Sequence, residues 1–108
     1  MFWIDFGPRT GSAPADRHPC VVVQTDIFNR SAIGTAVVCL ITSNLTRAKA
    51  PGNVFLKKGE AGLLKPSVVN VSQILTVDKA ELVEYAGKLT AVSVAGVRDG
   101  LHLLFERL

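Results

Sequence analysis

The stretch that decides the fold consists of two apolar runs, Arg17-His18-Pro19-Cys20-Val21-Val22-Val23-Gln24 and Thr35-Ala36-Val37-Val38-Cys39-Leu40-Ile41-Thr42-Ser43. The residues between the runs are rich in turn formers and close with Gly34. Two β-branched runs separated by such a segment predict an antiparallel hairpin, here centred near Arg30. Both runs are apolar almost throughout, which predicts that the hairpin is buried on both faces.

Polar side chains gather at one end of this hairpin. In the predicted register His18 faces Thr42, and Arg17 faces Ser43. Facing residues of such a pair have Cβ atoms about 4.5–5.5 Å apart. A cation, an imidazole and two hydroxyls therefore converge at one end of the sheet. These are the groups needed to grip and attack a phosphodiester.

Length and composition favour one folded domain over residues 1–108. The chain is 48% hydrophobic, and its length suffices for a real core. The longest apolar run, residues 36–41, is far shorter than the roughly 20 residues of a membrane helix. The first apolar residues meet an acid at Asp5, unlike a signal peptide. We therefore expect a soluble, cytoplasmic protein.

Charge is distributed unevenly along the chain, whose formal net charge is +3. Residues 1–76 contain eight basic and four acidic side chains, whereas residues 77–108 contain four basic and five acidic ones. A polyanion would therefore prefer the first part of the chain. The alternative is an ordinary solvated surface with an excess of lysine.

The two cysteines predict neither a disulfide nor a metal site. In the hairpin register Cys20 faces Leu40 and Cys39 faces Val21, so the thiols point to opposite faces of the sheet. Two dispersed cysteines and two histidines lack the spacing of a zinc site. We expect both cysteines to be small core residues, and any chemistry to need no metal or other cofactor.

Outside the hairpin the sequence predicts short strands followed by helices. Strands are expected over residues 1–6, 54–56 and 67–74. Asp78 and Glu81 form a capping pair, which predicts a short helix over residues 79–86 that ends at Gly87. Three- and four-residue steps predict a C-terminal helix with Val94, Val97, Leu101, Leu104 and Leu108 on one face, although Gly96 and Gly100 disfavour it. This order indicates an α+β domain with a small curled sheet or barrel.

The succession of motifs resembles the MazF/PemK family, toxins that are single-domain endoribonucleases of toxin–antitoxin systems. The matching stretches cover nearly the whole chain: Trp3-Ile4-Asp5-Phe6-Gly7-Pro8, Gly11-Ser12, residues 17–26 with Asn29, Ile41-Thr42-Ser43, Pro51-Gly52-Asn53-Val54, and residues 67–74 with Asp78-Lys79. The resemblance implies an SH3-like β-barrel of about five to seven short strands with a C-terminal helix, in a homodimer. It implies metal-independent, sequence-selective cleavage of single-stranded RNA to cyclic phosphate and 5′-hydroxyl ends. It also implies inhibition by a cognate antitoxin peptide.

The resemblance assigns catalytic roles at the polar end of the hairpin. The catalytic threonine of the family corresponds to Thr42. The catalytic arginine directly precedes the proline that opens the strand, a place held here by His18, with Arg17 one residue earlier. Either Arg17 grips the phosphate with its planar fork, or His18 takes part itself by transferring a proton. The alternatives are an exposed arginine, a histidine bonded to the backbone and a threonine that fills a strand end.

Five further side chains are candidate RNA contacts: Ser12, Asn29, Ser43, Asn53 and Gln73. Hydroxyls can bind phosphate and amides can read base edges, whereas turn chemistry and exposed sheet positions are the alternative for the amides. The family loop usually reads Gly-Ser-Glu, and Ala13 replaces the glutamate here. The missing carboxylate leaves a second function open, a catalytically weakened or non-catalytic module that binds nucleic acid or protein, like the gyrase poisons.

Overall fold

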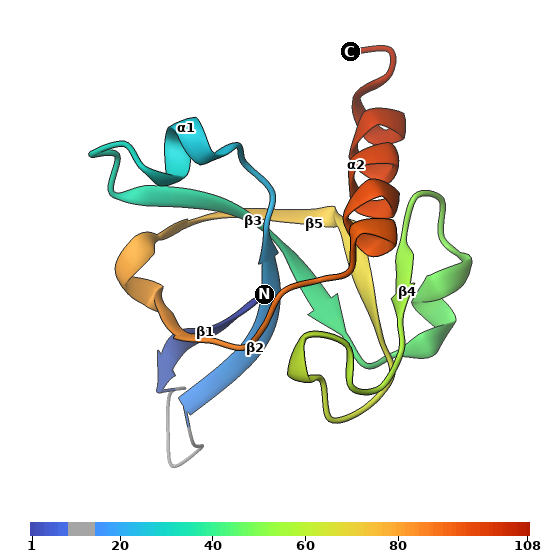
Figure 1. Cartoon of the computed structure of the whole chain (residues 1–108), viewed down its shortest axis with the longest axis horizontal. Coiled ribbons are helices and arrows are strands. Elements are labelled where there is room, and N and C mark those ends of the chain that lie inside the picture. Colours follow the sequence, from blue (N-terminus) through green and yellow to red (C-terminus); the bar gives the residue numbers. More distant parts are fainter. Residues whose placement is uncertain (9–14) are drawn as a thin grey trace.

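In the computed structural model, which describes residues 1–8 and 15–108, the chain forms a six-stranded antiparallel sheet with a C-terminal helix (Figure 1). The strands are β1 (Phe2–Pro8), β2 (Ala15–Val22), β3 (Thr35–Thr42), β4 (Val54–Leu56), β5 (Ser67–Asp78) and β6 (Leu82–Tyr85). The α-helices are α1 (Asp26–Asn29) and α2 (Ala91–Phe105). Three short 3₁₀ segments are η1 (Leu45–Lys49), η2 (Glu60–Gly62) and η3 (Lys79–Glu81).

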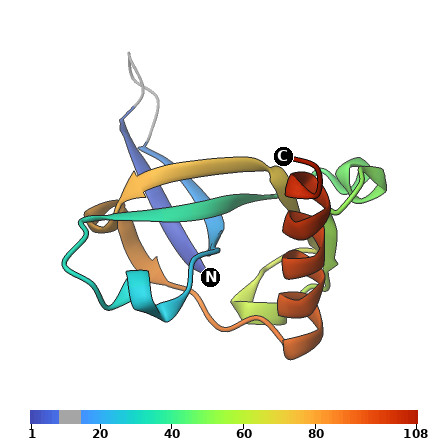
Figure 2. The same ribbon diagram turned by 90° about the horizontal axis from the view of Figure 1, so that it is seen from above.

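The strand order across the sheet is β4-β5-β3-β2-β1-β6. β3 and β5 run side by side through the middle of the molecule, and α2 stands against the end formed by β4 and β5 (Figure 2). Within the described residues β4 and β6 are the edges of the sheet, so the sheet curls without closing. The predicted α+β class and C-terminal helix are confirmed, and the barrel is an open one. None of the helices in the described residues is long and apolar enough to span a membrane.

The central hairpin of β2 and β3 has the register predicted from the sequence. Cys20 pairs with Leu40, and Val21 pairs with Cys39. Both thiols are buried and unbonded to each other, and each belongs to a different hydrophobic cluster. The prediction of two core cysteines on opposite faces is therefore confirmed. Burial raises the pKa of each thiol to about 11, which keeps both protonated at neutral pH.

Hydrophobic cores lie on both faces of this hairpin. The smaller core consists of Ile4, Cys20, Val38 and Val77. The larger core includes Cys39 and extends to α2; its buried members are Met1, Val21, Cys39, Ile41, Leu56, Leu63, Val69, Val71, Leu89 and Val97. Burial on two faces explains why the hairpin strands are apolar almost throughout.

Helix α2 packs most closely where the sequence has a glycine. A Cβ atom at Gly100 would overlap the carbonyl oxygen of Gly52, so only glycine lets the helix approach this loop. At the other end, the Thr90 side chain accepts a hydrogen bond from the Ser93 N–H at 3.1 Å. Thr90 in turn donates to Glu60 Oε2 at 3.2 Å. The glycine that disfavours a helix in the sequence is thus a packing requirement.

One predicted element is wrong. The sequence predicts a helix over residues 79–86, but the structure has only η3, followed by strand β6. The capping box exists, since the Asp78 N–H donates to Glu81 Oε1 at 3.2 Å. The chain then pairs with β1 instead of continuing the helix, and the Tyr85 ring meets the Phe2 ring edge-on at 5.3 Å. Pairing with a distant strand overrides the local helix signal.

Candidate functional site

A cleft of about 490 Å³ opens at the polar end of the β2–β3 hairpin. Five of the predicted site residues line it: Arg17, His18, Thr42, Ser43 and Gln73. The structure therefore brings the three candidate catalytic residues together, as the hairpin register predicts. Their roles remain predictions.

Arg17 lies near the start of β2 at the edge of the cleft. Its Nη2 donates a hydrogen bond to Glu84 Oε2 at 2.8 Å, and its Cζ lies 5.8 Å from the centroid of the Trp3 ring. The Arg17 and Glu84 side chains are 44% and 59% exposed, so their ion pair contributes only about 0–1 kcal/mol to folding. These neighbours hold a permanently charged guanidinium at the site without tying it into the core.

Thr42 and His18 approach the cleft from neighbouring strands. Thr42 ends β3, and its Oγ1 accepts a hydrogen bond from the Asn44 N–H at 3.1 Å. Accepting this bond uses a lone pair and leaves the hydroxyl proton to donate. His18 is half-buried in β2, where its backbone pairs with Ile4 of β1. The cleft thus contains a hydroxyl donor and an imidazole on rigid strands.

Gln73 reaches the cleft because β5 bulges. Residues 70–73 of β5 lie opposite Leu40 alone, and regular pairing with β3 resumes on both sides. Inside the bulge the buried Asn70 donates through Nδ2 to Gln73 Oε1 at 3.1 Å. The bulge therefore presents an amide that is already oriented by a hydrogen bond.

Two predicted RNA contacts, Asn29 and Asn53, do not line this cleft. Asn53 Oδ1 accepts the Val71 N–H at 2.9 Å, and its Nδ2 donates to the Arg47 carbonyl at 2.9 Å. Asn29 Nδ2 donates to the Asp26 carboxylate at 3.2 Å. The contacts of both amides are those of turn and loop chemistry, and their binding to RNA stays a prediction.

The predictions for Ser12 and Ala13 fall outside the described residues. The cleft also contains side chains that the sequence did not indicate, from the segment between η2 and β5. Lys65 adds a second cation, and Leu64 is 83% exposed. The buried Leu63 anchors this segment in the larger core. This contact joins distant parts of the chain, so no local sequence pattern predicts it.

The cleft offers a guanidinium, an ammonium group, an imidazole, hydroxyls and an amide. Such groups bind phosphate oxygens and transfer protons. Among the side chains that the structure describes, those of residues 1–4 and 17–108, no three of His, Cys, Asp or Glu group in a way that could hold a metal ion.

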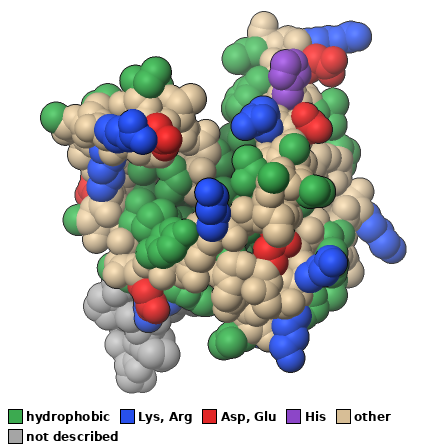
Figure 3. Space-filling model, viewed as in Figure 1, with side chains coloured by type: hydrophobic (Ala, Val, Ile, Leu, Met, Phe, Trp, Pro, Cys, Tyr) green, Lys and Arg blue, Asp and Glu red, His purple; other side chains and the backbone are tan. Residues whose placement is uncertain are grey.

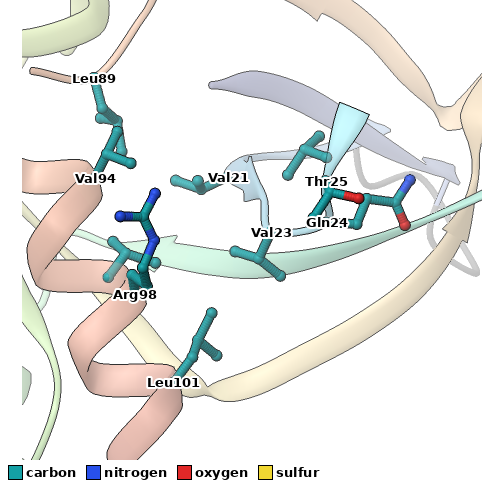
Figure 4. A pocket seen from close by; sticks show the side chains of 10 residues that line it. Val21, Val23, Gln24, Thr25, Leu89, Val94, Arg98 and Leu101 are labelled. Carbon is teal, nitrogen blue, oxygen red and sulfur yellow. The ribbon is translucent and has the colours of Figure 1, made fainter. Parts of the chain in front are cut away.

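A second hollow, which we call the apolar groove, lies between α2 and the other end of β2. It measures about 380 Å³, and Val21, Val23, Leu89, Val94 and Leu101 contribute most of its apolar wall, with Arg98 of α2 extending over it (Figure 4). Hydrophobic side chains gather along this hollow in the space-filling view (Figure 3). The two ends of β2 thus border two hollows, of which the cleft at the Arg17 end contains more polar and charged side chains.

Comparison with known proteins finds relatives that match nearly the whole chain. The profile of the PemK-like, MazF-like toxins of type II toxin–antitoxin systems matches residues 1–105. The endoribonuclease MazF6 of Mycobacterium tuberculosis is 40% identical over 106 residues, covering 98% of this chain and 93% of that protein. A mycobacterial endoribonuclease solved in complex with its cognate antitoxin has a TM-score of 0.78 at 21% identity, covering 99% of this chain and 91% of that one. A MazE–MazF crystal structure from Deinococcus radiodurans has a TM-score of 0.75 at 26% identity, covering 99% and 92%. The chain belongs to the family of PemK-like, MazF-like toxins of type II toxin–antitoxin systems.

Proposed function

We propose that the protein is a toxin endoribonuclease that cuts single-stranded RNA at selected sequences without a metal ion, in the cleft at the polar end of the hairpin. The observation that carries this proposal is the meeting of Arg17, His18 and Thr42 in one cleft of a MazF-like chain. The relative MazF6, which bears the name endoribonuclease, supports the same activity.

The chemistry follows from what these side chains can do. The 2′-oxygen of the RNA forms a bond to the neighbouring phosphorus, and the bond from phosphorus to the 5′-oxygen breaks. The 2′-hydroxyl proton goes to a base, and a proton is returned to the leaving 5′-oxygen, which leaves a cyclic phosphate and a 5′-hydroxyl. His18 is suited to these proton transfers because an imidazole has one nitrogen that can accept a proton and another that can donate one.

The crowded phosphorane needs charge stabilisation as it forms. The Arg17 fork provides it through charge-assisted hydrogen bonds, and Thr42 donates to a non-bridging oxygen. Arg17 holds the role of the family arginine in this scheme, although His18 occupies the position before the proline. Ser43 and Gln73 border the same cleft and are placed to contact the RNA.

The proposed partners are a cognate antitoxin peptide and a second copy of the chain. The MazE–MazF complex of the Deinococcus radiodurans relative supports the antitoxin. The exposed apolar side chains of α2, among them Val92, Leu103 and Phe105, support the homodimer because a second copy would cover them. We place the activity in the cytoplasm, where single-stranded RNA is available.

The test is incubation of the purified protein with a long RNA in EDTA, followed by mapping of the RNA ends. We expect discrete cuts with cyclic phosphate and 5′-hydroxyl ends, and about a 100-fold loss of rate in Thr42→Ala with its fold intact. RNA binding without turnover, in the protein as it stands and in Ala13→Glu, would overturn the nuclease. That result would favour the non-catalytic module.

A further inference from the structure

We propose that Glu84 is a positioning residue that holds the guanidinium of Arg17 at the cleft in the orientation the cleavage step requires. This inference rests on the proposed function and adds a residue to it. Glu84 is not among the residues that line the described cleft, so it acts through Arg17.

The strand pairing puts these side chains on one face of the sheet. Strand β1 lies between β2 and β6, and Trp3 of β1 pairs with Pro19 on one side and with Glu84 on the other. Arg17 is two residues from Pro19 along β2, so it shares the face of Pro19 and Trp3. A long arginine side chain on β2 therefore crosses the Trp3 ring to reach a carboxylate on β6.

Two contacts fix the cation from different directions. The hydrogen bond from Nη2 to Glu84 Oε2 measures 2.8 Å and holds the edge of the guanidinium. The Trp3 ring lies under it, with Cζ at 5.8 Å from the centroid, within the range of a cation–π contact. The ion pair with Glu84 engages Nη2, and we assign contact with the RNA phosphate to other N–H groups of the planar fork.

The pair is too exposed to serve mainly as a stabiliser of the fold. The Arg17 and Glu84 side chains are 44% and 59% exposed, so both charges are well solvated. The hydrogen bond at the edge of the guanidinium and the Trp3 ring at its face constrain the orientation of Arg17 more than they stabilise the fold. The same carboxylate repels an RNA phosphate that approaches Arg17. Glu84 should therefore weaken RNA binding slightly and speed the chemical step, because orientation matters most in the transition state.

The opposite effects expected on RNA binding and on the cleavage rate can be measured separately. Glu84→Gln keeps the size of the side chain and removes its charge, and Glu106→Gln, an exposed glutamate at the end of α2, is the matched control. Single-turnover cleavage is measured at saturating RNA, and binding is measured with an RNA that has a 2′-deoxy sugar at the mapped cut site. We expect Glu84→Gln to cut about 10- to 100-fold more slowly while binding as tightly as wild type or up to about fivefold more tightly. Glu106→Gln should match wild type in both.

Trp3 provides a readout that does not depend on turnover, because it is the single tryptophan of the chain. Release of the guanidinium uncovers the ring, so Glu84→Gln and Arg17→Ala should both raise the quenching of Trp3 fluorescence by acrylamide, and Glu106→Gln should not.

The outcomes separate the inference from the proposed function. If wild type cuts RNA but Glu84→Gln cuts within twofold of its rate, or binds RNA more weakly, the positioning role is overturned and the nuclease stands. If wild type does not cut, the nuclease fails, and unchanged Trp3 quenching in Glu84→Gln overturns the positioning role as well.

Discussion

The two ends of strand β2 border hollows of similar size that differ in the polar side chains they contain. The cleft at the Arg17 end collects cations, hydroxyls and an imidazole, whereas the apolar groove beyond Val21 is walled largely by valine and leucine. The eight residues of this strand thus border two different hollows. The comparison teaches that one short strand can present different side chains at its two ends while its buried middle, which includes Cys20, holds both ends in place.

The largest expected effect comes from removing the Arg17 cation from the cleft. Arg17→Ala should slow RNA cleavage about 100- to 1000-fold, because it removes the charge that we propose stabilises the phosphorane. Its melting temperature should change little, since the ion pair with Glu84 is exposed. The measurement is single-turnover cleavage beside thermal unfolding.

Arg98→Ala is the matched control, because it removes the cation of the apolar groove instead. Cleavage within about threefold of wild type is expected for it. An equal loss of cleavage rate in Arg17→Ala and Arg98→Ala would contradict the expectation that cleavage depends on the cleft and not on the apolar groove.

A smaller effect is expected where α2, the wall of the apolar groove, meets the loop at Gly52. Gly100→Ala places a Cβ against the Gly52 carbonyl, and the shift needed to relieve the overlap should cost about 1–3 kcal/mol of unfolding free energy. Gly34→Ala is the control, because a Cβ there meets nothing within 4 Å. Urea unfolding measures both variants. Equal midpoints would show that α2 is held without this contact.

The smallest effect concerns the thiols on the two faces of the hairpin. Their pKa of about 11 in the folded protein exceeds the value of 9.0 for an ordinary thiol. Folding therefore favours the protonated form, and the contribution to stability is complete below about pH 9 and is lost as the pH rises toward 11.

Comparison of wild type with Cys39→Ala isolates this contribution on the side of the apolar groove. The difference between their unfolding free energies should shrink by about 1 kcal/mol from pH 8 to pH 10. Urea titrations at the two pH values measure it. A constant difference would mean that Cys39 ionises in the folded protein as easily as in the unfolded chain.

The sequence was sufficient for the part of the fold that local pattern controls. The apolar runs and the turn between them determine the register of β2 and β3, and that register alone places His18 and Thr42 at one end. It also separates Cys20 from Cys39. These inferences need no contact beyond the hairpin itself.

The errors have a common physical cause, which is pairing between distant parts of the chain. Residues 82–85 carry a helix cap before them, but their partner is β1, some eighty residues earlier in the chain. The mistaken helix also concealed Glu84, since a helical residue would not face Trp3. Lys65 enters the cleft for a similar reason, because its neighbour Leu63 is buried in the larger core.

The bulge of β5 has a consequence for how this scaffold can diversify. Regular pairing with β3 resumes on both sides of residues 70–73, so the strand pairing of the sheet does not run through the bulge. The buried Asn70 anchors the bulge, while Gln73 remains exposed. Gln73, which we propose contacts RNA, is therefore a position where substitution is expected to change the choice of RNA more than the pairing of the strands.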